Sequence, residues 1–238
     1  HYTLEATLDE EAQQLEGGGT LVYHNRSPDA LEEMYFHLHL NAFRPNSRWA
    51  TVEAREQFDF QSLEDPDYAY ERLRSMRMGG VELTPEYPHA PDSTVVRFSL
   101  PEAIPAGTSA TFTFEWAARP STLCRRQCRQ GRHWDLAQWY PRVAVYDPDG
   151  WQTNPLQPQG EFYGEFATFD VTLEVAEDQV LGATGAVLEG DPGWEPEPTS
   201  PVQEVDLKSR WYVRPLEPVS PGWFAGEAPE GRRRVRFY

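Results

Sequence analysis

Lysine is almost absent from this 238-residue chain: Lys208 is the single lysine, and the other basic residues are arginines. With 21 Lys and Arg against 38 Asp and Glu, the formal net charge is −17. A protein that binds nucleic acid in general needs a basic face, so this balance argues against that class. Salt-adapted proteins often have such a lysine-poor acidic composition, and a GC-rich genome, which favours Arg codons, also leads to few lysines.

Long apolar runs are also lacking. No stretch of about 18 apolar residues occurs, so the sequence predicts no membrane span. The H-E-x-x-H, G-x-S-x-G, Walker and G-x-G-x-x-G motifs are absent as well. We therefore expect no catalytic residue and no enzyme complete within this chain.

Cysteine is scarce, with Cys124 and Cys128 as the two examples. Together with His133 they supply three metal ligands and no clear fourth, whereas structural zinc usually takes four. We therefore expect no metal site. A disulfide and two free thiols both remain open. The surrounding loop, 119–131, is rich in arginine, and we interpret it as a solvated tip or as a patch that binds acidic groups or another subunit.

The dominant pattern is an alternation of apolar and polar residues with a period of two. It recurs over 2–8, 72–78, 94–100, 109–116, 169–175 and 233–238, and 202–213 also resembles a strand. Such alternation is typical of half-buried strands. No βαβ rhythm is present. The sequence therefore predicts an all-β fold, an antiparallel β-sandwich with at most a short helix within 46–60.

Two local patterns complete the expected fold. Gly17, Gly18 and Gly19 predict a turn before the next strand. Residues 34–41 alternate, which would place His37 and His39 on one strand face; we expect them to be hydrogen-bonded rather than to bind a metal.

Three segments are more specific than any periodicity. They are Leu-Glu-Glu-Met-Tyr-Phe-His-Leu-His-Leu-Asn-Ala-Phe (31–43), Ala-Gln-Trp-Tyr-Pro-Arg-Val-Ala-Val-Tyr-Asp (137–147) and Gly-Glu-Phe-Tyr-Gly-Glu-Phe-Ala-Thr-Phe-Asp-Val-Thr-Leu (160–173). In order and spacing the chain resembles the N-terminal β domain of the gluzincin, aminopeptidase-type zinc metallopeptidases. The bacterial branch that carries Gln-Trp-Tyr-Pro is the most similar.

This resemblance implies that residues 1–238 form a single saddle-shaped β domain of a longer protein. Its partners would be the protein's own catalytic domain and a peptide substrate. The zinc, its ligands and the general-base Glu would lie in that catalytic domain, and none has a counterpart here. The expected function is to brace the catalytic domain and to form one wall of the peptide-binding cleft.

The resemblance also implies one site. In related aminopeptidases a Gln or Glu of this domain helps to bind the free amine of the substrate. Gln138 is the best candidate, since its side-chain carbonyl can accept from an ammonium group, and Tyr140 and Trp139 could line a pocket. The alternative is that Gln138 is a structural strand residue. Where the family has Cys and Asp-Glu-Pro, this chain has Arg142 and Asp147-Pro148. Glu161 and Glu165 could approach the cleft or could simply be solvated.

Two other functions remain open. One is a β-sandwich binding or scaffold module of a protein without peptidase activity. The other is a carbohydrate-binding module, suggested by eight tryptophans and favoured if their rings are exposed. Members of the similar bacterial branch are often exported or membrane-associated, which implies the cell envelope or secretion.

Overall fold

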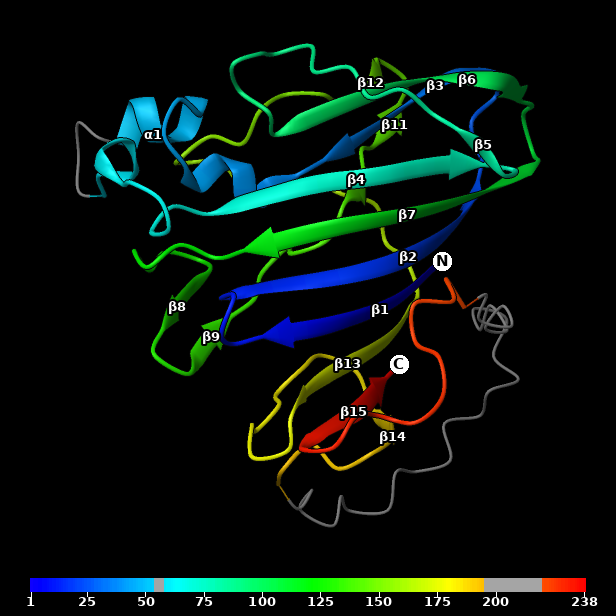
Figure 1. The fold of residues 1–238 in the computed structure, drawn as a ribbon. Helices are drawn as coiled ribbons and strands as arrows, with labels where there is room; N and C mark the ends of the chain where they lie inside the picture. The colour runs from blue at the N-terminus through cyan, green and yellow to red at the C-terminus, as the bar shows by residue number, and fades with distance from the viewer. Residues whose placement is uncertain (54–57, 195–219) are drawn as a thin grey trace, which may run out of the picture.

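The computed structural model describes residues 1–53, 58–194 and 220–238. Most of the strand residues belong to one eight-stranded sheet with the strand order β14-β15-β13-β1-β2-β7-β4-β5 (Figure 1). Its strands are β1 (Tyr2–Asp9), β2 (Gln14–His24), β4 (Tyr70–Met78), β5 (Val81–Glu82), β7 (Ser109–Arg119), β13 (Phe169–Ala176), β14 (Val187–Glu189) and β15 (Arg232–Phe237).

A three-stranded sheet with the order β10-β3-β6 packs against part of the large one. It comprises β3 (Leu31–His37), β6 (Val95–Ile104) and β10 (Arg142–Val143). Two small hairpins add β8 (Cys128–Gln130), β9 (His133–Asp135), β11 (Tyr146–Asp147) and β12 (Gly150–Trp151). The helical elements are η1 (His39–Phe43), α1 (Arg48–Glu53) and η2 (Phe60–Ser62).

The sequence prediction of an all-β sandwich with one short helix is confirmed. The strands expected over 2–8, 72–78, 94–100, 109–116, 169–175 and 233–238 are all present. One pair departs from the antiparallel arrangement, because β1 and β13 run parallel, with Tyr2 opposite Phe169. The long connection between these two strands makes a parallel pair feasible. The strand expected over 202–213 lies outside the described residues.

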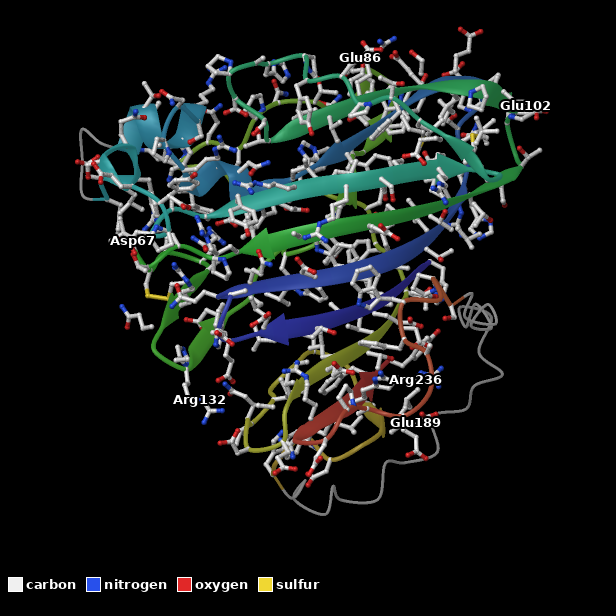
Figure 2. The ribbon with its side chains drawn as sticks, viewed as in Figure 1. Asp67, Glu86, Glu102, Arg132, Glu189 and Arg236 are labelled. Carbon is white, nitrogen blue, oxygen red and sulfur yellow. A yellow bond between two sulfur atoms is a disulfide. The ribbon has the colours of Figure 1, made fainter. Side chains whose placement is uncertain are left out.

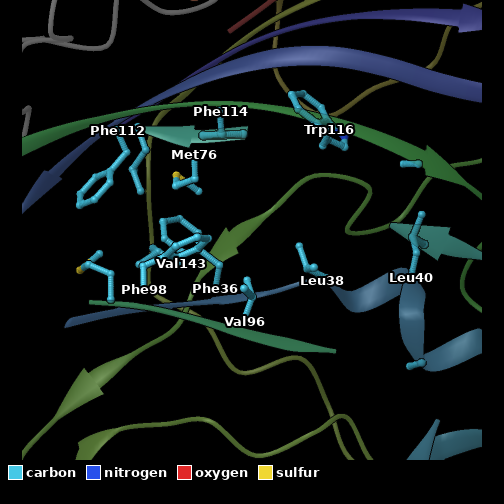
Figure 3. Close-up of a cluster of buried hydrophobic side chains, with 14 of the residues drawn as sticks. Phe36, Leu38, Leu40, Met76, Val96, Phe98, Phe112, Phe114, Trp116 and Val143 are labelled. Atoms are coloured by element: carbon cyan, nitrogen blue, oxygen red, sulfur yellow. The ribbon is translucent and has the colours of Figure 1, made fainter. Parts of the chain in front are cut away.

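The core lies between the two sheets (Figure 3). Phe36 and Phe98 of the small sheet contact one another and are fully buried, and Phe36 also meets Phe112 of β7 edge to face. On β7, Phe114 and Trp116 point into the same core, as the alternation predicts. Apolar burial of this kind is the main stabilising term in a sandwich.

The glycine cluster is a strand segment, so the predicted turn is wrong. Gly17, Gly18 and Gly19 lie in the middle of β2 and pair with β1 on one side and β7 on the other. A Cβ at Gly19 would stand 2.3 Å from the Phe114 ring, and one at Gly17 would stand 2.9 Å from Trp116. Glycine is needed here because large aromatic rings lie directly against the strand backbone.

Candidate functional site

The first part of the candidate site is a bend between β9 and β10. Gln138 lies in this bend with φ +53°, and it is half-buried. No strand includes Gln138, so the interpretation of Gln138 as a structural strand residue is wrong. β10 begins at Arg142, directly after Pro141. Pro141 has no N–H to donate to a strand ladder, which accounts for a strand that begins after it.

Arg142 connects the two most distinctive sequence segments. Its Nη1 donates to Oε1 of Gln138 at 3.0 Å, and its Nη2 donates to the backbone carbonyl of Glu165 at 3.1 Å. The guanidinium lies on Gly164, where a Cβ would come within 2.4 Å of Nη2. Segments 137–147 and 160–173, far apart in the chain, therefore meet at one side chain.

Tyr140 lies in a cluster of aromatic rings. Its ring meets Tyr2, Trp139 and Phe169 edge to face, with centroids 5.5–5.7 Å apart. Burial raises the pKa of Tyr140 to about 12, and the nearby Arg142 charge acts in the opposite direction. Tyr140 thus stays protonated at neutral pH, and no hydrogen bond to its hydroxyl occurs among the described residues.

An apolar pocket of about 190 Å³ adjoins this cluster. Trp139 and Tyr140 line it together with residues of β1, β13 and β15 and of the segment 182–185 (Gly-Ala-Thr-Gly). Among these are Phe169, Leu173, Ala183 and Phe237. Trp139 and Tyr140 thus both line a pocket, and their contact with a substrate stays a prediction. A larger, more open hollow of about 400 Å³ lies beside α1, but none of the residues from 137–147 or 160–173 lines it.

Segment 160–168 presents aromatic residues on both of its sides. Phe162 packs edge to face on His39, whereas Tyr163 and Phe166 are 59% and 104% exposed. Glu161 is exposed and pairs with Arg126 at 2.6 Å, and the Glu165 side chain is exposed too. The side chains of the two glutamates thus lie on the surface. Glu165 contacts Arg142 through its backbone carbonyl alone.

The two buried histidines do not share a strand. β3 ends at His37, and His39 begins η1, so the predicted common strand face is wrong. Their rings nonetheless stack, with centroids 4.8 Å apart. His37 Nε2 bonds to the Gln152 carbonyl at 3.2 Å, but neither ring nitrogen of His39 has a partner among the described residues. The expected hydrogen bonding therefore holds for His37 and fails for His39.

Burial sets the protonation of this pair. It lowers the pKa of His37 to about 4 and that of His39 well below its usual value, and the neighbouring Arg142 charge adds to both shifts. Glu71 lies nearby, fully buried, and accepts from the Leu40 N–H at 3.4 Å. Desolvation raises the pKa of the Glu71 carboxyl well above its usual value.

Cys124 and Cys128 form a disulfide, which settles the alternative left open by the sequence (Figure 2, where it is the yellow bond). The arginines of this loop are not all solvated. Arg119 is buried and pairs with Asp65 at 2.5 Å, and Arg129 is buried and donates to the Pro66 carbonyl at 2.7 Å. Arg119 and Arg129 therefore belong neither to a solvated tip nor to a surface patch that binds a partner. Both arginines hold the loop to the rest of the fold.

No protein-family pattern matches this chain, and no curated protein matches it. Solved structures do. A two-domain M1 zinc metallopeptidase bound to L-tryptophan is 13% identical, with a TM-score of 0.46 over 100% of this chain and 38% of its own. An M1 zinc metallopeptidase from Deinococcus radiodurans is 14% identical, with a TM-score of 0.46 over 100% of this chain and 37% of its own.

A third similar structure, yeast LTA4 hydrolase in complex with bestatin, is 9% identical, with a TM-score of 0.40 over 81% of this chain and 25% of its own. The chain resembles M1 zinc metallopeptidases. The resemblance stated from the sequence is thereby confirmed. The chain spans less than two fifths of the length of these structures.

The names of the similar M1 structures include zinc, but the described residues of this chain contain no set of zinc ligands. Within 1–53, 58–194 and 220–238, no three His, Cys, Asp or Glu side chains group closely enough to hold a metal ion. In the same ranges no helix is long and apolar enough to cross a membrane. Among the described tryptophans, Trp194 is the exposed one, at 42%, so this part of the chain offers no pair of exposed rings for a carbohydrate.

Sequence reasoning found Gln138 and Tyr140 but missed what holds them. Arg142 drew attention only as a departure from the family pattern, and Gly164 drew none. The signal in the sequence was Gly164 itself, which lies between Glu161 and Glu165 in a segment rich in aromatic residues. A missing side chain often marks the close approach of another group. The contact itself spans more than 20 residues, so no local pattern could predict it.

Proposed function

We propose that residues 1–238 are the N-terminal domain of an aminopeptidase-like zinc metallopeptidase. In this proposal the domain has no catalytic residue of its own. It braces the catalytic domain and forms one wall of the peptide-binding cleft, with Gln138 and Tyr140 as the substrate-binding residues. The zinc and its chemistry would belong to the catalytic domain.

The observation that carries this proposal is the junction made by Arg142. The segment with Gln138 and the segment with Tyr163 and Phe166 are two of the three segments that carry the resemblance to the family, and this junction brings them together. It lies next to an apolar pocket lined by Tyr140. A cleft wall requires such a set: a few placed polar groups beside apolar surface.

We also propose export to the cell envelope or beyond. The Cys124–Cys128 disulfide supports this location, since disulfides persist mainly in oxidising compartments.

The test is the kinetics of the full-length protein on short peptides. We expect Gln138→Ala to lower kcat/KM by about 10- to 100-fold, because a positioned amide contact with the substrate is lost. Gln130→Ala, which alters an exposed Gln on β8, is the matched control and should leave kcat/KM unchanged. Tyr140→Phe keeps the ring packing and removes the hydroxyl alone.

A full-length protein that cleaves no peptide would favour the alternative, a β-sandwich binding or scaffold module. If instead Gln138→Ala lowers the melting temperature and leaves kcat/KM unaltered, Gln138 is structural and leaves the proposed site.

A further inference from the structure

The guanidinium of Arg142 has an unusual environment in this acidic chain. The arginines of β15 and several on the surface pair with carboxylates, as Arg236 does with Asp170 at 2.7 Å. Arg142 is half-buried, yet no carboxylate within the described residues forms an ion pair with it. A charge withdrawn from water usually has a partner. Arg44 is also half-buried without an ion pair among the described residues, so it is the contact of Arg142 with Gln138, together with the missing ion pair, that points to a ligand.

The position of this guanidinium is fixed rather than adaptable. The Arg142 backbone pairs with His37 in the ladder between β10 and β3. Its side chain lies on Gly164, where any Cβ would overlap Cζ at 2.5 Å. A guanidinium held from both its backbone and its face is preorganised, which reduces the entropy lost when a ligand binds.

Arg142 also decides which way the Gln138 amide faces. A guanidinium has five N–H donors and no acceptor, so the oxygen of the amide must turn towards it. Oε1 of Gln138 therefore accepts from Nη1, and Nε2 points away with no acceptor among the described residues. Two of the five Arg142 donors are used, by Gln138 and by the Glu165 carbonyl, and the others have no acceptor within the same residues.

We propose that Gln138 and Arg142 together form a binding site for a carboxylate group. The site offers hydrogen-bond donors and a positive charge, which is what a carboxylate binds best, often through two parallel bonds. An ammonium ion would find the Gln138 acceptor, Oε1, already beside a guanidinium, and like charges repel. The group recognised by Gln138 is thus of the opposite kind to the free amine that the sequence resemblance implies.

This inference rests on the proposed function in one respect, namely that the carboxylate belongs to a peptide. It would be either the C-terminal carboxylate or an acidic side chain. The chemistry is the same for both sources, and peptides that lack one or the other distinguish them.

The first experiment uses the 238-residue chain and sodium acetate as the probe. Nuclear magnetic resonance would follow the Gln138 side-chain amide and the Arg142 Nε–H during a titration at constant ionic strength, with methylammonium chloride as the second probe. We expect both signals to shift saturably with acetate and not with methylammonium. Arg142→Gln should weaken acetate binding at least about tenfold, since a charged donor is lost.

Two further variants keep this test decisive. Arg44→Gln removes the same charge from another half-buried arginine, one that lies near Tyr68 and has no ion pair among the described residues, and it should leave acetate binding unchanged. Gln138→Glu gives Arg142 an internal carboxylate; it should preserve the fold and abolish acetate binding. This second variant answers the question even if Arg142→Gln fails to fold.

Three results would overturn the proposal. They are a response to methylammonium but not to acetate, an equal loss of acetate binding in Arg44→Gln and Arg142→Gln, and no saturable response in the unaltered chain.

The second experiment uses the full-length protein and two series of peptides. One series compares free with amidated C-termini, and the other compares Glu with Gln side chains. We expect Arg142→Gln to lower kcat/KM about tenfold or more for the series whose carboxylate is bound, and not for its neutral counterpart. An equal loss for neutral peptides would contradict the proposal. Failure to cleave any peptide, with acetate binding intact, would refute the proposed function and leave the carboxylate site standing.

Discussion

The two ends of the large sheet are held together by different forces. Under the small sheet, β2, β7 and β4 contribute a dense apolar core, in which Phe36 meets Phe112. At the other end, β13 and β15 carry ion pairs along one face. Arg232 and Arg234 both bind Glu174, at 3.2 and 2.8 Å, and Arg236 lies beside Glu189 (Figure 2). We call the small sheet together with β2, β7 and β4 the sandwich half. We call β13 to β15 the ion-pair end.

The candidate site lies where these two halves meet. Tyr140 packs on Tyr2 of β1 and on Phe169 of β13, and Arg142 belongs to the small sheet. The sandwich half therefore positions the guanidinium, while the apolar face of the ion-pair end supplies much of the pocket. Because each half supplies a different part of the site, mutations in the two halves should have distinguishable effects on it.

The largest expected effect is in the sandwich half. Phe36→Ala should lower the free energy of unfolding by about 3–5 kcal/mol, since a fully buried ring is replaced by a cavity. Denaturant unfolding monitored by circular dichroism measures this loss. Phe166→Ala is the control, because that ring is fully exposed and its removal should cost less than about 0.5 kcal/mol. Similar losses in the two variants would mean that the core is not where the stability lies.

The second effect is a loss of stability in acid, also from the sandwich half. His37 has a folded pKa of about 4, below the unfolded value of 6.5, so its contribution is lost as pH falls below about 6.5. Each pH unit costs roughly 1.4 kcal/mol per histidine, which amounts to about 3 kcal/mol for His37 by pH 4. His39 shifts in the same direction.

Denaturant unfolding at pH 7 and pH 4.5 measures this loss of unfolding free energy. His39→Phe should make the loss smaller. His133→Gln, which alters an exposed side chain, is the control and should leave the loss unchanged. Glu71 has the opposite sign. Its raised folded pKa makes its contribution full below about 4.5 and diminishing as pH rises. A stability that is equal at pH 7 and pH 4.5 in all three proteins would contradict the assignment to the histidines.

The third effect separates the two halves directly. Glu174→Gln leaves Arg232 and Arg234 without their carboxylate, and we expect a loss of about 2 kcal/mol, below the usual cost for a fully buried pair because both arginines reach solvent. Hydrogen exchange should show the loss in β13 and β15, with β7 still protected. Glu189→Gln, 70% exposed, should cost less than about 0.5 kcal/mol. Equal loss of protection in β7 would mean that the sheet unfolds as one unit.

The sequence was sufficient for the features set by local alternation. The inward Phe112, Phe114 and Trp116 of β7 follow directly from a period of two, and so does the all-β class. It failed at Gly17–Gly19, because glycine is typical of turns and the rings that require it here come from β7, about 100 residues later. Contacts at long range decide what a glycine does, and no window of sequence contains them.

The candidate site was predicted in part for the same reason. Gln138 and Tyr140 could be chosen because the segment containing them resembles a family, but their geometry depends on Arg142 and Gly164. The sequence analysis treats Gln138 as an isolated amide, whose carbonyl oxygen can accept from an ammonium group. The neighbouring guanidinium orients that amide, and only the folded chain brings the two side chains into contact.

The smallest effect is that of salt, which acts on the stability of the chain in two opposite directions. A chain of net charge −17 repels itself, and ions screen this repulsion over about 8–10 Å at ~0.1–0.15 M salt, so overall stability should rise with potassium chloride. The ion pairs of β13 and β15 are screened too, and they should weaken. The gain for the unaltered chain between low salt and about 1 M is therefore modest, on the order of 1 kcal/mol.

Glu174→Gln sharpens this comparison, because the variant has lost the attraction that salt would weaken and keeps most of the repulsion that salt relieves. Its melting temperature should rise more steeply with salt than that of the unaltered chain, and the difference in unfolding free energy between the two should shrink by a few tenths of a kcal/mol. Phe36→Ala is the matched variant in the sandwich half, and its cost should be the same at both salt concentrations, since apolar packing in the core carries no charge to screen. A melting temperature that is flat or falls with salt would show that repulsion among the surface carboxylates does not limit the stability of this fold.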